Sequence, residues 1–517
     1  MTAYAQTPQT DPEQPEQHQE AEGRAARRRA DSGGGKGSAL LVFALPVLVA
    51  LACVLPGLGG RQLWRDEHAT WWASTLSWHY LGQLIDHIDI VFTPYYAGMH
   101  LWIAVAGDSP AALRLPEALA MGISAGLVAL LGRRMFAVRT GLLAGLLFAV
   151  VPAITRYGQE ARPYAFATLF ALLATLFLLR ALEKPSLRDW TLYALAIAAT
   201  GFGHLVAMSV LAGHLGLVVL AKRRGDRIAH YAFAGAALLG LSITLPMVAK
   251  GSGQSGQIAW NTTTTQDLVD FPQELFGSWI TGGVVMGLGV LGLLAARRYA
   301  LLLGAWAVLP PVLTFLTADQ LHLFLPRYLL FTIPAWTLLL AAAVTRLTGR
   351  LEPEARPGAV AKAVGGGVLV TAVAAGYAFV AWPAIGDAKK DLPMEPDYAA
   401  AANVIASGEK PGDGVIFNGG LSERRAISYE LRDRKAPKDV LMEWTPQQNG
   451  SYGATECGQP TRCLKGVDRL WLVSTIADGR PPLTGADKKK AAAIDEDFKA
   501  TRTVRLNRVV VQVLERK

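Results

Sequence analysis

RQLWRDEHAT, residues 61–70, is a polar stretch that follows directly on the first long apolar run of the chain. It contains an acidic pair, Asp66 and Glu67. Charges at the edge of a bilayer are costly and tend to be functional. The alternative is a solvated loop in which both acids pair with Arg61 and Arg65. The class of protein that surrounds this stretch decides between the two interpretations.

The composition indicates a membrane protein. Of the 517 residues, 51% are hydrophobic and only 18% are charged, whereas a soluble globular protein carries about 25% charged residues. The deficit is concentrated in apolar runs long enough to cross a bilayer. The net charge is +9. Most of the basic residues lie in short loops between spans or are balanced by acidic residues in the tail. We therefore expect no nucleic-acid partner.

The apolar runs predict a polytopic all-α membrane domain with about eleven transmembrane helices. Basic residues gather in alternate loops, and Arg27-Arg28-Arg29 precede the first run, which predicts a cytoplasmic N-terminus. An odd number of spans then places both the Asp66 loop and the C-terminal tail outside the cell membrane. Within that loop, 71–85 and 96–105 are expected to form interfacial helices. The expected spans are 38–58, 115–132, 140–156, 163–182, 189–204, 205–221, 229–249, 277–296, 299–318, 328–346 and 363–383.

Three regions follow from this layout. Residues 1–37 are polar and are expected to be a disordered cytoplasmic segment. Residues 38–383 form the membrane domain, and 384–517 form a small extracytoplasmic α/β domain. In that domain, helices are expected at 398–407, 422–432 and 488–499, and strands at 414–417, 469–474 and 504–514.

The three cysteines divide between these regions. Cys53 lies in the first span, where pairing is difficult, and Cys457 and Cys463 lie close together in the tail. An extracytoplasmic position favours a disulfide between the latter two, with two free thiols as the alternative.

Sugar transfer from a lipid-linked phosphate needs residues that this chain offers on its predicted external face. The acceptor hydroxyl needs a carboxylate base, for which Asp66 is suitable. The leaving phosphate needs positive charge, for which Arg162 and Arg327 are suitable, although Arg162 could instead be an arginine whose charged end reaches the membrane surface. Further candidates for substrate or metal binding are Arg65, Glu67, His68, Tyr95, Tyr96, His100, Tyr157, Glu160 and Tyr164. His100, in an apolar stretch, could equally be a structural interfacial histidine.

Five segments in order, with the acidic pair before them, resemble the GT-C superfamily of integral-membrane glycosyltransferases. The resemblance covers about residues 38–346 and is strongest to the bacterial family-39-like group, related to protein O-mannosyltransferases and lipid A aminoarabinose transferases. The segments are PYYAGMHLW at 94–102, GDS at 107–109, LRLP at 113–116, QEARPY at 159–164 and PRYLL at 326–330.

This resemblance implies a polyprenyl-phosphate-linked sugar donor and an inverting transfer on the external face. It implies that Asp66 is the base or orients the acceptor, with Glu67 and Glu160 as further acidic residues of the catalytic site. Some relatives use a divalent metal, and His68 and Glu160 are the candidate ligands here. The tail lacks the sugar-binding repeat domain of the eukaryotic mannosyltransferases, which argues against a protein acceptor.

The leading hypothesis is therefore a cell-membrane glycosyltransferase that moves a sugar such as mannose or arabinose to a cell-envelope glycan, lipid or protein. A transporter or flippase of a lipid-linked or amphipathic substrate is the alternative. Transporters place charges near the midplane of their spans, whereas the acids of this chain gather in external loops. A third possibility is a scaffold whose tail recruits an envelope partner. The acidic and arginine motifs favour the enzyme over both.

Overall fold

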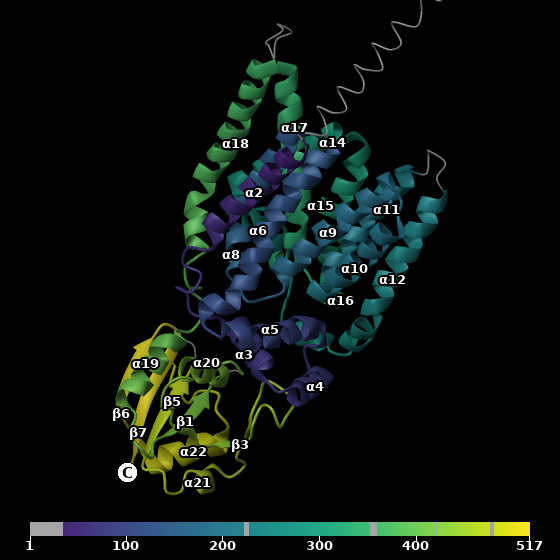
Figure 1. Ribbon diagram of the computed structural model, residues 1–517. Helices are drawn as coiled ribbons and strands as arrows, with labels where there is room; N and C mark the ends of the chain where they lie inside the picture. Colours follow the sequence, from purple (N-terminus) through teal and green to yellow (C-terminus); the bar gives the residue numbers. More distant parts are fainter. Residues whose placement is uncertain (1–34, 222–226, 352–358, 420, 476–479) are drawn as a thin grey trace, which may run out of the picture.

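The computed structural model describes residues 35–221, 227–351, 359–419, 421–475 and 480–517. A bundle of helices occupies one end of the molecule and a small mixed domain the other, and three short helices lie between them (Figure 1). Nearly all of the predicted disordered segment, 1–37, lies outside the described residues.

The bundle consists of helices from residue 35 to residue 387. Small residues let these helices approach closely, as is usual where lipid provides no hydrophobic force between helices. A Cβ added to Gly141 would collide with the carbonyl oxygen of Ala129, and one added to Gly292 would collide with that of Leu339. The helices are α2 (Gly35–Val54), α6 (Pro110–Met135), α7 (Val138–Ala149), α8 (Pro152–Gly158), α9 (Tyr164–Glu183), α10 (Leu187–Gly203), α11 (Val210–Ala221), α12 (Arg227–Ser252), α13 (Thr265–Phe276), α14 (Trp279–Ala296), α15 (Ala300–Leu316), α16 (Ala318–Leu321), α17 (Ile333–Leu351) and α18 (Ala359–Asp387), with 3-10 turns η2 (Leu205–Ser209), η4 (Ser255–Ile258), η5 (Arg297–Tyr299) and η6 (Pro326–Thr332).

The structure shows a multi-pass membrane protein but does not confirm eleven spans. Among the described residues, six helices are long and apolar enough to cross a bilayer, or seven if α7 and α8 count as one span bent by 58°. The remaining predicted spans correspond to shorter pieces, such as α11 with 12 residues. The apolar pattern located the helices correctly but could not show where a turn interrupts them.

Three helices at the end of the bundle face the tail domain (Figure 1). They are α3 (Arg65–Thr75), α4 (Trp78–His87) and α5 (Thr93–Ala106), with η1 (Ile90–Phe92) before α5. The prediction of a single helix over 71–85 is wrong, because α3 ends at Thr75 and Ser77 begins α4. Its hydroxyl accepts a hydrogen bond from the backbone N–H of Tyr80, the usual role of serine at a helix N-terminus.

The tail domain is a five-stranded mixed sheet between two layers of helices. The strand order is β2-β1-β5-β7-β6, with β1 parallel to β2 and β5, and β7 antiparallel to β5 and β6. Val415 and Phe417 of β1 pack against α19 and α20, while Ile416 packs on the opposite face beside α22. The elements are α19 (Tyr398–Gly408), β1 (Gly414–Asn418), α20 (Glu423–Glu430), β2 (Lys438–Asp439), β3 (Met442–Trp444), β4 (Thr455–Glu456), α21 (Pro460–Cys463), β5 (Arg469–Ser474), α22 (Lys488–Asp497), β6 (Phe498–Leu506) and β7 (Val509–Arg516).

One detail of the tail differs from the sequence prediction, and another agrees with it. The single strand expected at 504–514 is a hairpin, because Asn507 and Arg508 form a turn in which Arg508 has a φ of 54°. The exposed, charged face of β6 hid this strand from a search for apolar runs. Cys457 and Cys463 form the disulfide that their spacing and location favoured.

The glycine contacts give a test of the bundle packing. We expect Gly141→Ala to lower the free energy of unfolding by about 1–3 kcal/mol, because the added methyl meets backbone that cannot move aside. The matched control is Gly283→Ala in α14, where an added Cβ has no atom within 4 Å. Thermal unfolding in detergent should separate the two variants, and equal melting temperatures would contradict the close packing of α6 and α7.

Candidate active site

The acidic pair lies in the first turn of α3, directly after Trp64. The Glu67 carboxylate accepts a hydrogen bond from the backbone N–H of Trp64 at 3.3 Å, which closes the N-terminus of the helix. Carboxylates are stabilised at this end of a helix by its dipole. The polar stretch 61–70 therefore ends an extended loop and begins the helix that carries Asp66.

Glu67 is fully buried in a bidentate ion pair with Arg114 of α6, with both N–O distances at 2.7 Å. Arg114 also donates to the carbonyl oxygens of Leu58, Arg61 and Gln62. Glu67 accepts from protein groups on both carboxylate oxygens and has no exposed surface. This geometry favours a positioning role over the catalytic role that the sequence suggested.

Asp66 points the other way and stays accessible. Its side chain is 26% exposed and lies 3.9 Å from Nη2 of Arg327. The Arg327 guanidinium carbon lies 5.5 Å from the ring centre of Trp64 and 5.6 Å from that of Tyr328. The aromatic rings hold this cation in place, so Asp66 faces a fixed positive charge from a segment 261 residues away in the chain (327 minus 66).

A second acid lies nearby, in the loop between α8 and α9. The Glu160 carboxylate is 2.8 Å from Nη2 of Arg156 and 3.9 Å from Nη2 of Arg61. Burial raises the pKa of Glu160 to about 7, although Arg156 acts in the opposite direction. A carboxyl that titrates near neutral pH beside a cavity is typical of a functional site.

A polar cavity of about 470 Å³ opens between α8, α13 and α18. Arg327, Arg156 and Glu160 line it. The cavity wall therefore includes the guanidinium that contacts Asp66 and the one that pairs with Glu160. Its lining residues are Trp64, Pro152, Ala153, Arg156, Tyr157, Glu160, Gln273, Glu274, Gly277, Arg327, Ala384, Asp387, Ala388 and Leu392. Tyr157, which the sequence suggested as a substrate-binding residue, is therefore one of the residues that line this cavity.

Arg162 and Tyr164 lie next to each other at the start of α9. Arg162 is 5% exposed and its guanidinium carbon lies 4.2 Å from the ring centre of Phe92. Its Nη1 is 3.4 Å from the Thr70 hydroxyl, and Nε has no hydrogen-bond partner. Such depth in the protein does not fit an arginine that merely reaches the membrane surface.

Three other predicted binding residues form contacts away from this cavity. The hydroxyl of Tyr95 donates to Glu117, and that of Tyr96 donates to Asp89 at 2.9 Å. His100 Nδ1 lies 2.9 Å from the carbonyl oxygen of Ser74, the structural role that was the alternative for this histidine. None of the three is among the cavity lining.

Arg65 also takes part in a contact that the sequence did not reveal. Its Nε lies 3.6 Å from Glu395, in the segment that leads into the tail domain. Burial raises the pKa of the Glu395 carboxyl. Arg65 thus joins α3 to the tail.

The residues do not fit the predicted metal site. Within the described part of the chain, no group of three or more His, Cys, Asp or Glu side chains could hold an ion. His68 is enclosed by the rings of Tyr398 and Tyr429, at 5.9 and 5.6 Å between ring centres. Burial lowers the pKa of His68 to about 3, so this side chain is a neutral part of the interface between α3 and the tail.

Comparison with known proteins identifies the fold. Residues 94–249 match the family model described as dolichyl-phosphate-mannose-protein mannosyltransferase. The chain superimposes on ArnT from Cupriavidus metallidurans, in crystal structures with undecaprenyl phosphate and without it, with a TM-score of 0.60. The chain has the fold of a GT-C glycosyltransferase.

The structural match extends over nearly the whole molecule. It covers 93% of this chain and 98% of ArnT at 16% sequence identity. A weaker likeness, with a TM-score of 0.46 and 11% identity, connects 83% of the chain with 67% of an oligosaccharyltransferase from Archaeoglobus fulgidus. No curated protein matches the sequence at a significant level. The resemblance found in the motifs is therefore confirmed for the GT-C fold.

Three residues of the site were given no role from the sequence, although Arg156 opens the segment that contains Glu160. Arg156 lies in α8 and Glu274 in α13, and Glu395 lies far along the chain. The spacing of Arg156 and Glu160, four residues apart, was the one available signal, since side chains at this spacing meet on a helical turn. The other contacts are formed only by tertiary folding.

The Glu67 and Arg114 pair can be tested by stability. We expect Glu67→Gln to cost about 3–5 kcal/mol, because it leaves a guanidinium buried without its counter-charge. Thermal unfolding of the purified protein measures the loss, and Arg114→Met should produce a loss of similar size. A Glu67→Gln protein with the wild-type melting temperature and no transferase activity would restore the catalytic role instead.

The pKa of Glu160 predicts a pH dependence of stability. Because burial raises this pKa from 4.5 to about 7, the neutral carboxyl stabilises the fold at low pH, and that stability is lost as the pH rises through about 7. Wild-type protein should therefore lose more melting temperature than Glu160→Gln between about pH 5 and pH 8. Parallel profiles for the two proteins would show that Glu160 does not titrate in this range.

Proposed function

We propose that this protein transfers a sugar, such as mannose or arabinose, from a polyprenyl-phosphate donor to a cell-envelope acceptor on the external face of the membrane. The observation that carries the proposal is the contact of Asp66 with Arg327, since Arg327 lines a cavity together with Arg156 and Glu160 while Asp66 itself lies just behind it, outside the lining. An accessible acid and two fixed cations are what this transfer needs.

In the proposed reaction, an acceptor hydroxyl attacks the anomeric carbon of the donor sugar. A bond forms between the acceptor oxygen and that carbon, and the bond from the carbon to the phosphate oxygen breaks. Asp66 orients the hydroxyl and takes its proton, a role that requires an accessible carboxylate. Attack from the side opposite the phosphate inverts the anomeric configuration.

The leaving polyprenyl phosphate keeps the electron pair of the broken bond and needs no proton. Arg327 and Arg156 in the cavity wall supply positive charge to its oxygens, and Arg162, buried close to Thr70, adds to the local field. Guanidiniums suit this task because they bind phosphate through two parallel hydrogen bonds. Their fixed positions stabilise charge as it develops.

An apolar groove of about 330 Å³ supports a lipid-linked donor. It lies between α5, α6, α9 and α10, and Tyr95 in its wall is engaged through its hydroxyl with Glu117. ArnT, which shares the fold, was crystallised with undecaprenyl phosphate. The lining residues are Pro94, Tyr95, Gly98, Met99, Trp102, Pro116, Pro163, Phe166, Phe170, Phe202 and Gly203.

The external location follows from the distribution of loop charges. The Asp66 loop and the tail lie at the same end of the bundle (Figure 1). Along the chain, every second loop between apolar runs is rich in arginine, and neither the Asp66 loop nor the tail is one of these loops. With basic loops in the cytoplasm, both lie outside, where envelope glycans and lipids are the available acceptors.

Transfer of radiolabelled sugar from a panel of polyprenyl-phosphate donors to an envelope extract tests the proposal. We expect wild-type membranes to transfer from one donor and Asp66→Asn to reduce the rate by about 10²–10⁴-fold, with no change in melting temperature. The matched control is Asp86→Asn, an exposed acid of α4 in the same loop, paired with Lys250.

Two outcomes would overturn this function. Full activity of Asp66→Asn would remove the assigned base. Movement of a labelled polyprenyl-phosphate sugar across the membrane of proteoliposomes, without any transfer of the sugar, would favour the transporter instead.

A further inference from the structure

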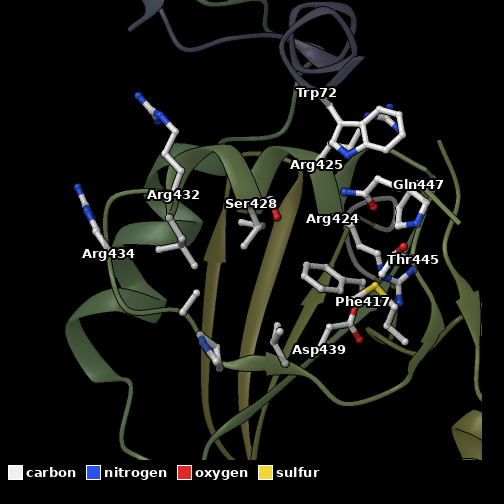
Figure 2. Close-up of a pocket in the computed structure, with 17 residues that line it drawn as sticks. Trp72, Phe417, Arg424, Arg425, Ser428, Arg432, Arg434, Asp439, Thr445 and Gln447 are labelled. Carbon is white, nitrogen blue, oxygen red and sulfur yellow. Dashed lines mark hydrogen bonds and ion pairs between the residues drawn. The ribbon is translucent and has the colours of Figure 1, made fainter. Parts of the chain in front are cut away.

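A second cavity, of about 490 Å³, lies where the tail domain meets α3. One wall is Trp72 from α3, and the rest comes from α20, the end of β1 and the loop before and after β2. Figure 2 shows Trp72 and Arg425 at one end and Arg432 and Arg434 at the other, with Ser428 between them. The membrane domain and the tail therefore build this pocket together.

The pocket is positively charged. Four arginines line it against a single aspartate, Asp439. Arg424 is neutralised by Asp439 and Glu456, and Arg432 pairs with Asp108. In the described part of the chain, Arg425 and Arg434 form no ion pair, and Arg434 donates only to the amide oxygen of Asn403.

Arg425 is the more unusual of these two cations. It is 7% exposed, donates through Nη1 to the carbonyl oxygen of Tyr452 at 3.1 Å, and has no partner for Nε. Burial lowers the pKa of its guanidinium. Asp89 and Glu423 oppose this shift from a distance, but they accept hydrogen bonds from the hydroxyls of Tyr452 and Thr475, respectively.

A buried guanidinium that no carboxylate contacts directly is costly unless an anion pairs with it. The anion would enter beside an aromatic residue, because Trp72 lines the same end of the pocket and packs against Tyr452 at 5.4 Å between ring centres. Trp71, its neighbour, donates its indole N–H to Asp108, whereas the Trp72 indole makes no hydrogen bond within the residues that the structure describes. Trp72 is 7% exposed, and the part of its ring that lines the pocket can pack against a sugar.

We propose that this pocket binds the acceptor, an oligosaccharide that carries phosphate or carboxylate groups. The phosphate or carboxylate groups of the acceptor pair with Arg425 and Arg434, and one of its sugar rings packs against Trp72. The inference rests on the proposed function and names the acceptor class for it. Trp72 is six residues after Asp66 on α3, about 9 Å along the helix and on a different face of it, so the acceptor must be long enough to extend around α3 to the base.

Binding can be measured without transfer. We would titrate the full-length protein in lipid nanodiscs with trigalacturonate, and with neutral maltotriose and inorganic phosphate as comparison ligands, by calorimetry. Trigalacturonate should bind, and Arg425→Gln and Arg434→Gln should each weaken it by about tenfold or more, the loss expected for one charge-assisted contact. Arg505→Gln on the exposed face of β6 is the matched control and should bind like wild type.

Each alternative result has one meaning. Equal binding of maltotriose, binding unchanged in both pocket variants, or no binding of trigalacturonate would overturn the proposal. Arg434 is exposed, so its substitution should not affect folding even if loss of Arg425 does. Calorimetry measures binding without any transfer of sugar, and therefore failure of the proposed transfer would not be mistaken for failure of this pocket.

Discussion

The buried ion pair between Glu67 and Arg114 is the constraint on which the rest of the site depends. It joins the first turn of α3 to α6, and Arg114 also ties down the carbonyl groups of the preceding loop. Glu67 in turn accepts from the backbone N–H of Ala161 at 2.9 Å, between Glu160 and Arg162. The Glu67 carboxylate thus holds the start of α3, which carries Asp66, close to the loop that carries Glu160 and Arg162. Such a pair is stabilising only while both members are present.

The tail domain is held against the same helix by a second polar cluster. Asp108 accepts from the indole of Trp71 at 2.8 Å and from Arg432 of the tail, and the hydroxyl of Tyr429 donates to its backbone carbonyl. On the other side, Tyr452 reaches Asp89. Because these contacts converge on α3 and its neighbours, the tail and the helix that carries Asp66 are positioned together rather than as independent parts.

The sequence predicted much of this fold because membrane spans leave a strong pattern. Long apolar runs located the bundle helices, and the acidic and arginine motifs led to the pair formed by Asp66 and Arg327. The pattern did not show that α7 and α8 bend between Ala149 and Pro152, since the apolar run continues from Ala149 to Ile154 without a polar residue. Nor could it separate two adjacent acids with opposite orientations. Asp66 and Glu67 differ only by the direction in which α3 points each side chain, which depends on α6 and the loop after α8.

The same reasoning explains where charge is left uncompensated. Within the membrane domain, most buried charges have partners, as Glu67 and Glu160 do, because an unpaired charge in a low-dielectric interior costs several kcal/mol. Arg425 of α20, like Arg162, has no ion pair within the described residues, and it lines a pocket with Trp72 near the C-terminal end of α3. A helix is a rigid spacer of about 1.5 Å per residue. Trp72 and Asp66 therefore stay about 9 Å apart along α3 but leave the helix on different faces. An acceptor that reaches both must pass around α3, so the fold would select it by length as well as by charge.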